Sequence, residues 1–433
     1  MPSSVINMFD HFKNLVANLG TERDKQSSGN YALSFLTDEQ WSLIYRTSWM
    51  GRKVIDIPAK DATRKWREWQ AETDQITAIE NEEKRLQLQQ KTKLAIQQGR
   101  LFGGSGIYFS IKNDDPALPL DLNTVKKGSL EFITVLSKNV LVAGDIELDP
   151  LSPGYGKPKN YQVSGSASGL QEIHPSRLAL FVGNEILTPG ELIGADQGWG
   201  DSVLQSAYEA VRNADSTASN VASLVYEAKV DVLQIPDLGT IMANPRTRAM
   251  LEERVVLSGQ LKGNNGMLVI DGEEQYSQKT FTFAGLPEIT YQTLQSVSGA
   301  ADIPLTRFLG QSPGGLNNTG ETDLKNYYDS VNSMQTLEFS PALRSLDEAL
   351  IRSALGSRPE KITYEWSSLW QMSDEQKSKI SKETSETIKI LVESGLFPEQ
   401  DLAKAAGNLI VEHSILPSFQ VTGDIEDPED DEL

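Results

Sequence analysis

Several residue types that carry common protein chemistry are scarce or missing in this sequence. Its 433 residues include no cysteine and only three histidines, His11, His174 and His413. Disulfides, thiolate catalysis and cysteine-bound zinc are therefore excluded. No apolar run is long enough to span a bilayer, and the start, MPSSVINMFDHFKNLVANLG, lacks the pattern of a signal peptide. We expect neither a disulfide-rich secreted protein nor a membrane protein.

Positive charge is also scarce. The chain has 40 Lys and Arg against 60 Asp and Glu, a net charge of −20. A protein that grips duplex DNA is ordinarily basic, because Lys and Arg neutralise the phosphates. Two interpretations stay open at this point. The chain is either an acidic protein with no nucleic-acid role, or a surface past which DNA slides because carboxylates repel it.

A folded core is nevertheless expected. The hydrophobic fraction is 39% and the charged fraction 23%, and the length suits two or three domains. After a polar arm, residues 1–36, the sequence becomes helical with Thr37 and Gln40 as a capping box. We expect a break at Pro58, a second helix over 61–70 and a third over 78–98.

Short segments rich in apolar and β-branched residues follow these helices. Turn residues separate them, which predicts an antiparallel or mixed sheet and an α+β fold class. The five expected strands are 106–112, 130–136, 140–146, 160–165 and 177–183.

The second half of the sequence is mainly helical. Asp201 or Ser202 is expected to cap a helix that reaches about Lys229. A strand–turn–strand insert with an Asp271-Gly272 turn separates the next two helices, and a long helix over 321–355 contains Pro341, which we expect to kink it. Seven of the last ten residues are acidic, so that tail is expected to be disordered.

Two glycine-rich segments were tested as phosphate-binding loops. GQSPGGLNN is not a P-loop, because Leu316 stands where the motif needs a lysine. LFGGSGIYF fails the dinucleotide fingerprint, because Phe109 replaces its last glycine and the glycines precede a strand. A tight turn at a close backbone approach is the favoured interpretation of LFGGSGIYF.

No constellation of catalytic or metal-binding residues emerges. His174 precedes a proline, and we favour a turn or hydrogen-bonding role for it over general-base catalysis. The acidic side chains of VIDGEEQ are interpreted as a solvated turn, not as a metal site. The segment RKWREW, residues 64–69, could stack nucleic acid, but an amphipathic helix burying Trp66 and Trp69 is favoured. We expect no enzyme, no catalytic residues, no metal and no cofactor.

Five segments, in this order and at these distances, resemble the portal proteins of tailed bacteriophages and prophages, the head-to-tail connectors. They are YRTSWMGRKVIDIPAKDATRKWREW, GRLFGGSGIYF, IHPSRLALFVG, GWGDSVLQSAYEAVRNA and GAADIPLTRFLGQSPGGLNNTGETDLKNYYDSV. The resemblance runs from about Thr37 to Gln376. It implies an α/β wing, a helical stem, a small β-hairpin clip, a long kinked helix and a helical C-terminal crown.

The resemblance also implies where these parts lie. After the arm at 1–36, the wing and a leading helix would occupy 37–243. Stem helix 1 would be 244–262, the clip 263–287, stem helix 2 288–306, the tunnel loop 307–320, the kinked helix and return to the wing 321–372, the crown 373–423 and the acidic tail 424–433.

Two groups of site residues follow from the resemblance. In the clip, terminase and adaptors would dock at Asp271, Gly272, Glu273, Glu274 and Gln275. The tunnel loop would face DNA with Gln311, Ser312, Pro313, Gly314, Gly315, Leu316, Asn317, Asn318 and Thr319. No Lys or Arg lies between Arg307 and Lys325, so this loop would not grip phosphate. An ordinary surface loop is the alternative interpretation.

The implied function is a ring, usually of twelve subunits, at one capsid vertex of a virion assembled in the bacterial cytoplasm. Double-stranded DNA would be packaged through it by the terminase large subunit and later ejected into the tail. Capsid and scaffold proteins and a head–tail adaptor would be further partners, and no membrane is expected. Two alternatives stay open: a phage-encoded enzyme or accessory protein acting on nucleic acid without a ring, and a terminase-binding adaptor.

Overall fold

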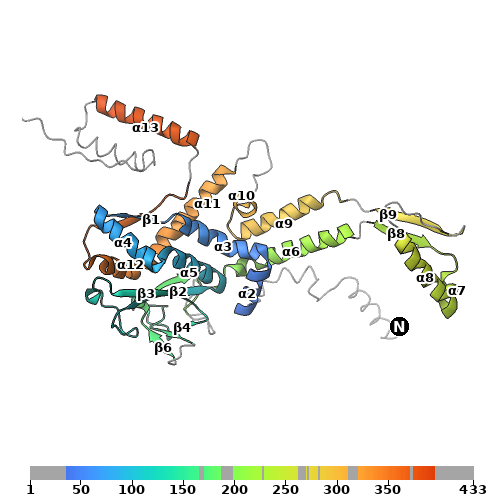
Figure 1. Ribbon diagram of the computed structural model, residues 1–433, viewed down its shortest axis with the longest axis horizontal. Helices are drawn as coiled ribbons and strands as arrows, with labels where there is room; N and C mark the ends of the chain where they lie inside the picture. The colour runs from blue at the N-terminus through green and yellow to red at the C-terminus, as the bar shows by residue number, and fades with distance from the viewer. Residues whose placement is uncertain are drawn as a thin grey trace, which may run out of the picture. The chain divides into compact units, whose positions relative to one another are not determined.

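The computed structural model describes residues 36–164, 170–186, 198–226, 229–261, 270, 273–280, 283–310, 320–370 and 374–394 (Figure 1). The rest of the arm, the loop 311–319, Asp271, Gly272 and everything after Ser394 lie outside the described residues. The chain divides into two compact units. One is Met1–Arg64 with Trp69–Thr363, and the other is Lys65–Glu68 with Tyr364–Leu433.

The first two helices are α2 (Asp38–Thr47) and α3 (Trp49–Arg64), and the capping box at Thr37 and Gln40 is confirmed. The break predicted at Pro58 is wrong, because α3 continues through it. Pro58 has no N–H to donate to the Val54 carbonyl one turn earlier. The Arg100 guanidinium donates to that carbonyl instead, at 3.0 Å.

The helix predicted over 61–70 is also wrong in its second half. After α3 the chain forms strand β1 (Arg67–Gln70), in which Arg67 and Trp69 are buried and Glu68 and Gln70 are exposed. This period of two belongs to a strand. The single helix expected over 78–98 is two, α4 (Thr73–Leu86) and α5 (Leu88–Phe102), because Gln87 between them has a left-handed backbone with φ 55°.

All five predicted strands are found, some shorter than expected. A further strand, β6, joins them. The strands are β2 (Gly104–Ile111), β3 (Leu130–Ser137), β4 (Leu141–Ala143), β5 (Tyr161–Val163), β6 (Gln171–Ile173) and β7 (Leu178–Val182). They form two antiparallel sheets, ordered β3-β2-β7 and β4-β5-β6. Two short 3-10 turns, η2 (Leu122–Thr124) and η3 (Pro175–Arg177), lie in the loops.

The sheet β3-β2-β7 lies between two layers. Along β2, Ser105 faces α5 and its hydroxyl donates to the Ala95 carbonyl, while Tyr108 on the opposite face packs against a buried cluster that includes Leu141 and Tyr161. Figure 1 shows helices on one side of this sheet and the small sheet on the other. The alternation of β2 therefore divides the core into a helical and a β layer.

The middle of the chain contains α6 (Leu204–Tyr226), β8 (Lys229–Gln234), α7 (Leu238–Ala243), α8 (Pro245–Leu261), β9 (Gln275–Thr280) and α9 (Leu286–Ala300). The first strand and the turn of the hairpin predicted within 263–287 lie mostly outside the described residues, which omit 262–269, Asp271 and Gly272. Strand β9 pairs with β8, antiparallel, from Lys229 opposite Thr280 to Gln234 opposite Gln275. Likewise α9 packs along α6, not along the helix expected over 244–262.

The last elements are α10 (Leu305–Leu309), α11 (Glu321–Met334), a π-helical turn η4 (Gln335–Phe339), α12 (Ser340–Leu355), β10 (Thr363–Trp366) and α13 (Asp374–Ser394). Strand β10 pairs with β1. The expected α+β class is confirmed, with mostly helical structure and small antiparallel sheets.

Candidate functional site

The loop proposed to face DNA, 311–319, lies outside the described residues, but both of its flanks are described. Helix α10 ends at Leu309 and helix α11 begins at Glu321. Both flanks contact α3. The candidate site is therefore the set of side chains that hold these two flanks to α3.

One carboxylate connects α3 to both flanks. Asp61, only 1% exposed, accepts two hydrogen bonds from the Arg307 guanidinium, at 2.9 and 2.8 Å, and one from the Tyr327 hydroxyl at 3.1 Å. Arg307 belongs to α10 and Tyr327 to α11. A two-pronged Arg–carboxylate contact fixes orientation as well as distance.

The electrostatics of this cluster are consistent with its geometry. The hydrogen bond to Asp61 raises the pKa of Arg307 above its ordinary value. Burial raises the pKa of Tyr327, and the negative charge of Asp61 raises it further. Arg307 therefore stays charged and Tyr327 stays a hydroxyl donor at every physiological pH.

A second contact fastens α10 to α3. Phe308 is fully buried and its ring lies 5.9 Å from that of Trp49. The Lys53 ammonium donates to the Phe308 carbonyl and lies over both rings, 5.1 Å from the Trp49 centroid and 5.6 Å from the Phe308 centroid. The flank that precedes the loop is thus held by Asp61 and Lys53 together.

Left-handed glycines mark the two boundaries of the loop. Gly310 ends α10 with φ 71°, and Gly320 caps α11 with φ 64°. Residues with a Cβ rarely adopt this conformation. Gly314 and Gly315, within the loop, lie outside the described residues.

The helix behind the loop contains an irregularity just before Pro341. The turn η4 is π-helical, and such turns are rare and often occur at functional sites. Its first residue, Gln335, donates to the Ala62 carbonyl of α3 at 2.7 Å, and its carbonyl accepts from the Ser340 hydroxyl at 3.0 Å. The sequence predicted a disturbance at Pro341 but not its π-helical form.

The segments that carried the resemblance meet around the turn between α5 and β2. The Gly103 carbonyl accepts from the amides of Gly183 and Gly200. A Cβ on Gly104 would lie 2.1 Å from the Trp199 ring. The tight turn at a close backbone approach is therefore confirmed, and it joins three of the five segments.

The proposed docking residues have different environments. Asp271 and Gly272 lie outside the described residues, while Glu273 and Gln275 are exposed. Glu274 is only 8% exposed and accepts two hydrogen bonds from Arg254 of α8, at 2.8 and 2.6 Å. This carboxylate holds the start of β9 to α8 and is not presented for docking.

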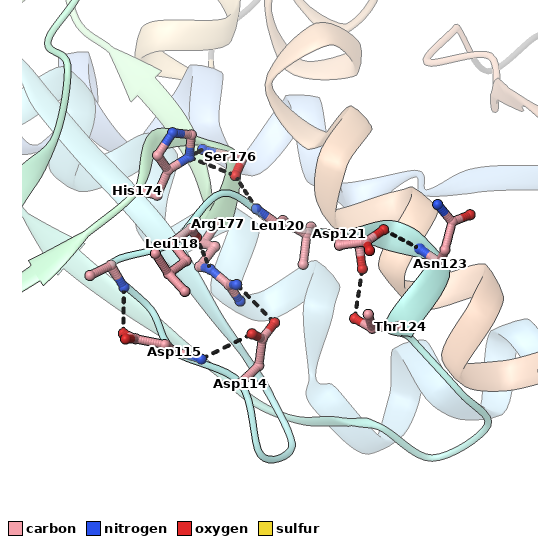
Figure 2. A network of polar contacts seen from close by, with 11 residues as sticks. Asp114, Asp115, Leu118, Leu120, Asp121, Asn123, Thr124, His174, Ser176 and Arg177 are labelled. Carbon is pink, nitrogen blue, oxygen red and sulfur yellow. Dashed lines mark hydrogen bonds and ion pairs between the residues drawn. The ribbon is translucent and has the colours of Figure 1, made fainter.

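His174 has a structural role, as the sequence suggested. Figure 2 shows its ring beside Ser176, with Nδ1 2.8 Å from the Ser176 hydroxyl. The Ser176 amide also donates to Nδ1, so this nitrogen is the acceptor. The Ser176 hydroxyl in turn accepts from the Leu120 amide, and the buried Arg177 pairs with Asp114 at 2.8 Å. This network fastens the loop after β2 to β7.

The described residues also form a cavity that could hold a ligand. This cavity of about 460 Å³ is lined by apolar side chains and rings and by a few charged groups, among them Glu185 and Glu338. Burial raises the pKa of Glu338. Within the described ranges, no group of three or more His, Cys, Asp or Glu side chains could hold a metal ion. The lining of the cavity does not identify a cofactor.

The residues that sequence reasoning missed are Asp61, Arg307, Tyr327, Lys53 and Arg100. Only Asp61 left a signal in the sequence. It falls three to four residues after Ile57 and Pro58 on the apolar side of α3, where an acidic residue needs a partner.

Comparison with known proteins decides the family. The profile of the phage portal protein family matches residues 39–390. The chain belongs to the phage portal protein family. Among solved structures, this portal-family chain is similar to a chain from the neck of an empty gene transfer agent particle, computed with C6 symmetry. That match has 14% identity and a TM-score of 0.52, and it covers 91% of this chain and 98% of the other.

A second neck structure, computed with C12 symmetry, matches with 13% identity and a TM-score of 0.50 and covers 85% of this chain and 93% of the other. At such identities the likeness shows the fold alone.

A curated relative carries a different name. The portal-family chain is 40% identical over 426 residues to a protein of Caulobacter sp. (strain RHG1) named anti-CBASS protein Acb1. The match covers 95% of this chain and 68% of the relative. The remainder of that relative lies outside the match.

Among the residues that the structure describes, no helix is both long enough and apolar enough to cross a bilayer.

Proposed function

We propose that this chain is the subunit of a portal ring, a channel at one capsid vertex through which double-stranded DNA is packaged and later ejected. The observation that carries the proposal is the family match over residues 39–390. The similar folds in the necks of gene transfer agent particles support it. The proposed role is structural and not enzymatic.

The pairing of elements changes how the parts are assigned. We propose α6 and α9 as the stem helices, since these two pack along each other. We propose as the clip the pair β8 and β9, with the helices α7 and α8 between them in sequence. Glu273 and Gln275 remain candidates for docking the terminase large subunit or a head–tail adaptor, since both are exposed.

The flanks of segment 311–319 support its assignment as the tunnel loop. Both are fastened to α3, and the helix that follows contains the π-helical turn. Neutral side chains at the tip would pass duplex phosphates without gripping them. The chain's charge of −20 would also disfavour sticking within a Debye length of about 8–10 Å.

Mass measurement tests the ring directly. Light scattering of the purified chain, with negative-stain images of the same sample, should give about twelve times 47.7 kDa and ring-shaped particles. A monomer that stays monomeric when capsid scaffold protein is added would refute the proposal.

Packaging assays test the loop. Replacing Gly314 and Gly315 with alanine or proline should impair DNA packaging while rings still assemble. Normal packaging in such a variant would refute the tunnel-loop assignment.

An anti-CBASS role is a second candidate, favoured by the name of the Caulobacter relative. If the matched part of that relative carries the activity, expressing this chain alone should counteract CBASS in cells. If the activity lies outside the match, this chain should have no effect while the longer relative does. The assay does not depend on ring formation, so it separates the two candidates.

A further inference from the structure

The partners of Asp61 lie far apart in the sequence. Arg307 precedes segment 311–319 and Tyr327 follows it, yet both donate to the same carboxylate, and both reach its Oδ2 atom. Asp61 itself is on α3 and only 1% exposed. A buried carboxylate with this little solvent depends on its hydrogen-bond partners.

Further side-chain contacts of the two flanks also lead to α3, while α10 in addition packs against α9. Phe308 is held by Lys53, and Gln335 is held by the Ala62 carbonyl, directly after Asp61. The Arg64 guanidinium lies 3.7 Å from Asp61 and over the Tyr328 ring at 4.8 Å. Both flanks are therefore held to α3, and Asp61 is the group on α3 that accepts hydrogen bonds from both.

Sharing one carboxylate makes the two flanks interdependent. If α10 moves away, the Asp61 carboxylate loses its hydrogen bonds from Arg307. The hydrogen bond with Tyr327 then has as its acceptor a buried charge that is incompletely paired. If α11 moves away, the charge pair with Arg307 loses a hydrogen-bond donor. In networks of this kind the removal of one member weakens the others.

We infer that Asp61 is a positioning residue that couples the two ends of segment 311–319, so that α10 and α11 hold to α3, or leave it, together. The inference rests on the proposed function only where segment 311–319 is taken as the tunnel loop. The coupling itself is a property of Asp61, Arg307 and Tyr327.

The chain contains a matched control for this cluster. Asp56, also on α3, accepts from the Tyr45 hydroxyl at 3.0 Å and from Gln97 at 2.7 Å, and neither partner belongs to α10 or α11. Asp56→Asn therefore makes the same chemical change as Asp61→Asn on the same helix, and Tyr45→Phe on α2 makes the same change as Tyr327→Phe. Neither control substitution touches the flanks.

Hydrogen exchange measured by mass spectrometry on the purified full chain tests the coupling. Asp61→Asn should accelerate amide exchange about tenfold or more in both 305–310 and 321–328, while Asp56→Asn should leave both peptides unchanged. Acceleration in one flank only, or equal acceleration by Asp56→Asn, would overturn the inference.

Tyr327→Phe is a more specific test of the coupling, and it still decides the question if Asp61→Asn fails to fold. This variant removes one hydroxyl from α11, yet it should accelerate exchange in α10, which that hydroxyl does not touch. Tyr45→Phe should not do so. Unchanged exchange over 305–310 in Tyr327→Phe refutes the coupling. None of these measurements requires a ring, so a failure of the proposed function would be seen separately by light scattering.

Discussion

Single polar side chains fix several contacts of this protein. Thr37 and Gln40 were predictable as a capping box because their partners lie three residues apart. Asp61 was not, because its partners lie 246 and 266 residues away in the sequence. Local hydrogen bonds can be predicted from a sequence, whereas a long-range partner is known only once the fold brings it near.

His174 predicts a pH dependence of stability. Burial lowers its pKa, and the charge of Arg177 lowers it further, so the unfolded chain takes up this proton at a higher pH than the folded chain does. The contribution of neutral His174 is therefore complete above about pH 6.5 and is lost as the pH falls through the lowered pKa.

Comparing wild type with His174→Asn checks this prediction, because Asn keeps a capping side chain without titrating. The stability advantage of the wild type, measured by urea unfolding, should shrink between pH 7 and pH 5. Parallel pH curves for the two proteins would contradict the assignment.

Gly310 predicts an effect of opposite sign from that of another glycine. At φ 71°, with open space around it, Gly310→Ala should lower the free energy of unfolding by about 1 kcal/mol through backbone strain alone. Gly239 in α7 also has open space but no positive φ, so Gly239→Ala should be neutral or stabilising by up to about 1 kcal/mol. Chemical denaturation of both variants checks the pair, and equal effects would argue against backbone strain at Gly310.

At the scale of elements, short runs of apolar and β-branched residues between turn residues were the most reliable signal. The strands β2, β3 and β7 were expected close to their observed positions because apolar and β-branched residues mark them. The break at Gln87 was missed because nothing in the sequence marks a residue other than glycine that adopts a left-handed backbone. Strand β1 was missed because Trp66 and Trp69 also fit a helical spacing, and β8 because its partner lies far along the chain.

The continuity of α3 through Pro58 predicts a coupling between two substitutions. Arg100→Met should leave the Val54 carbonyl without its donor and lower stability by about 1–3 kcal/mol. Pro58→Ala restores an N–H at position 58 that can reach this carbonyl. In that background the cost of Arg100→Met should fall by about 1 kcal/mol.

A double-mutant cycle by chemical denaturation measures this coupling. Strictly additive effects would show that the Arg100 contact does not compensate for Pro58. Burial lowers the pKa of Arg100 only to about 10, so the side chain is charged throughout the assay.

At the scale of the whole molecule, exposed apolar side chains gather in one stretch of the chain. Within residues 224–291 they are Leu224, Val225, Leu238, Met242, Met250, Val255, Val256, Leu257, Ile270, Tyr276, Phe283, Ile289 and Tyr291. Large exposed apolar side chains often mark surfaces that contact a partner. A subunit of the ring proposed above would bury them against its neighbours.

Val256→Asp on α8 should therefore weaken assembly. The expected effect is at least tenfold in the association constant, which corresponds to about 1.4 kcal/mol. Leu151→Asp is the control, since Leu151 is 93% exposed and lies outside this stretch. Sedimentation velocity at matched concentrations checks both variants. Equal behaviour of the two would show that apolar exposure in 224–291 is not tied to subunit contact.

The pairing of Lys229 with Thr280 has a consequence for how this protein can change. Because these residues are cross-strand partners, the chain enters and leaves the segment between them through neighbouring strands, which lie about 5 Å apart. The segment is thus an insertion with adjoining ends, the arrangement in which whole-segment exchange is best tolerated. A replacement segment of another length or composition would need to keep only this strand pair. The protein could then bind a new partner through that segment without altering the packing of α3, α5 and β2.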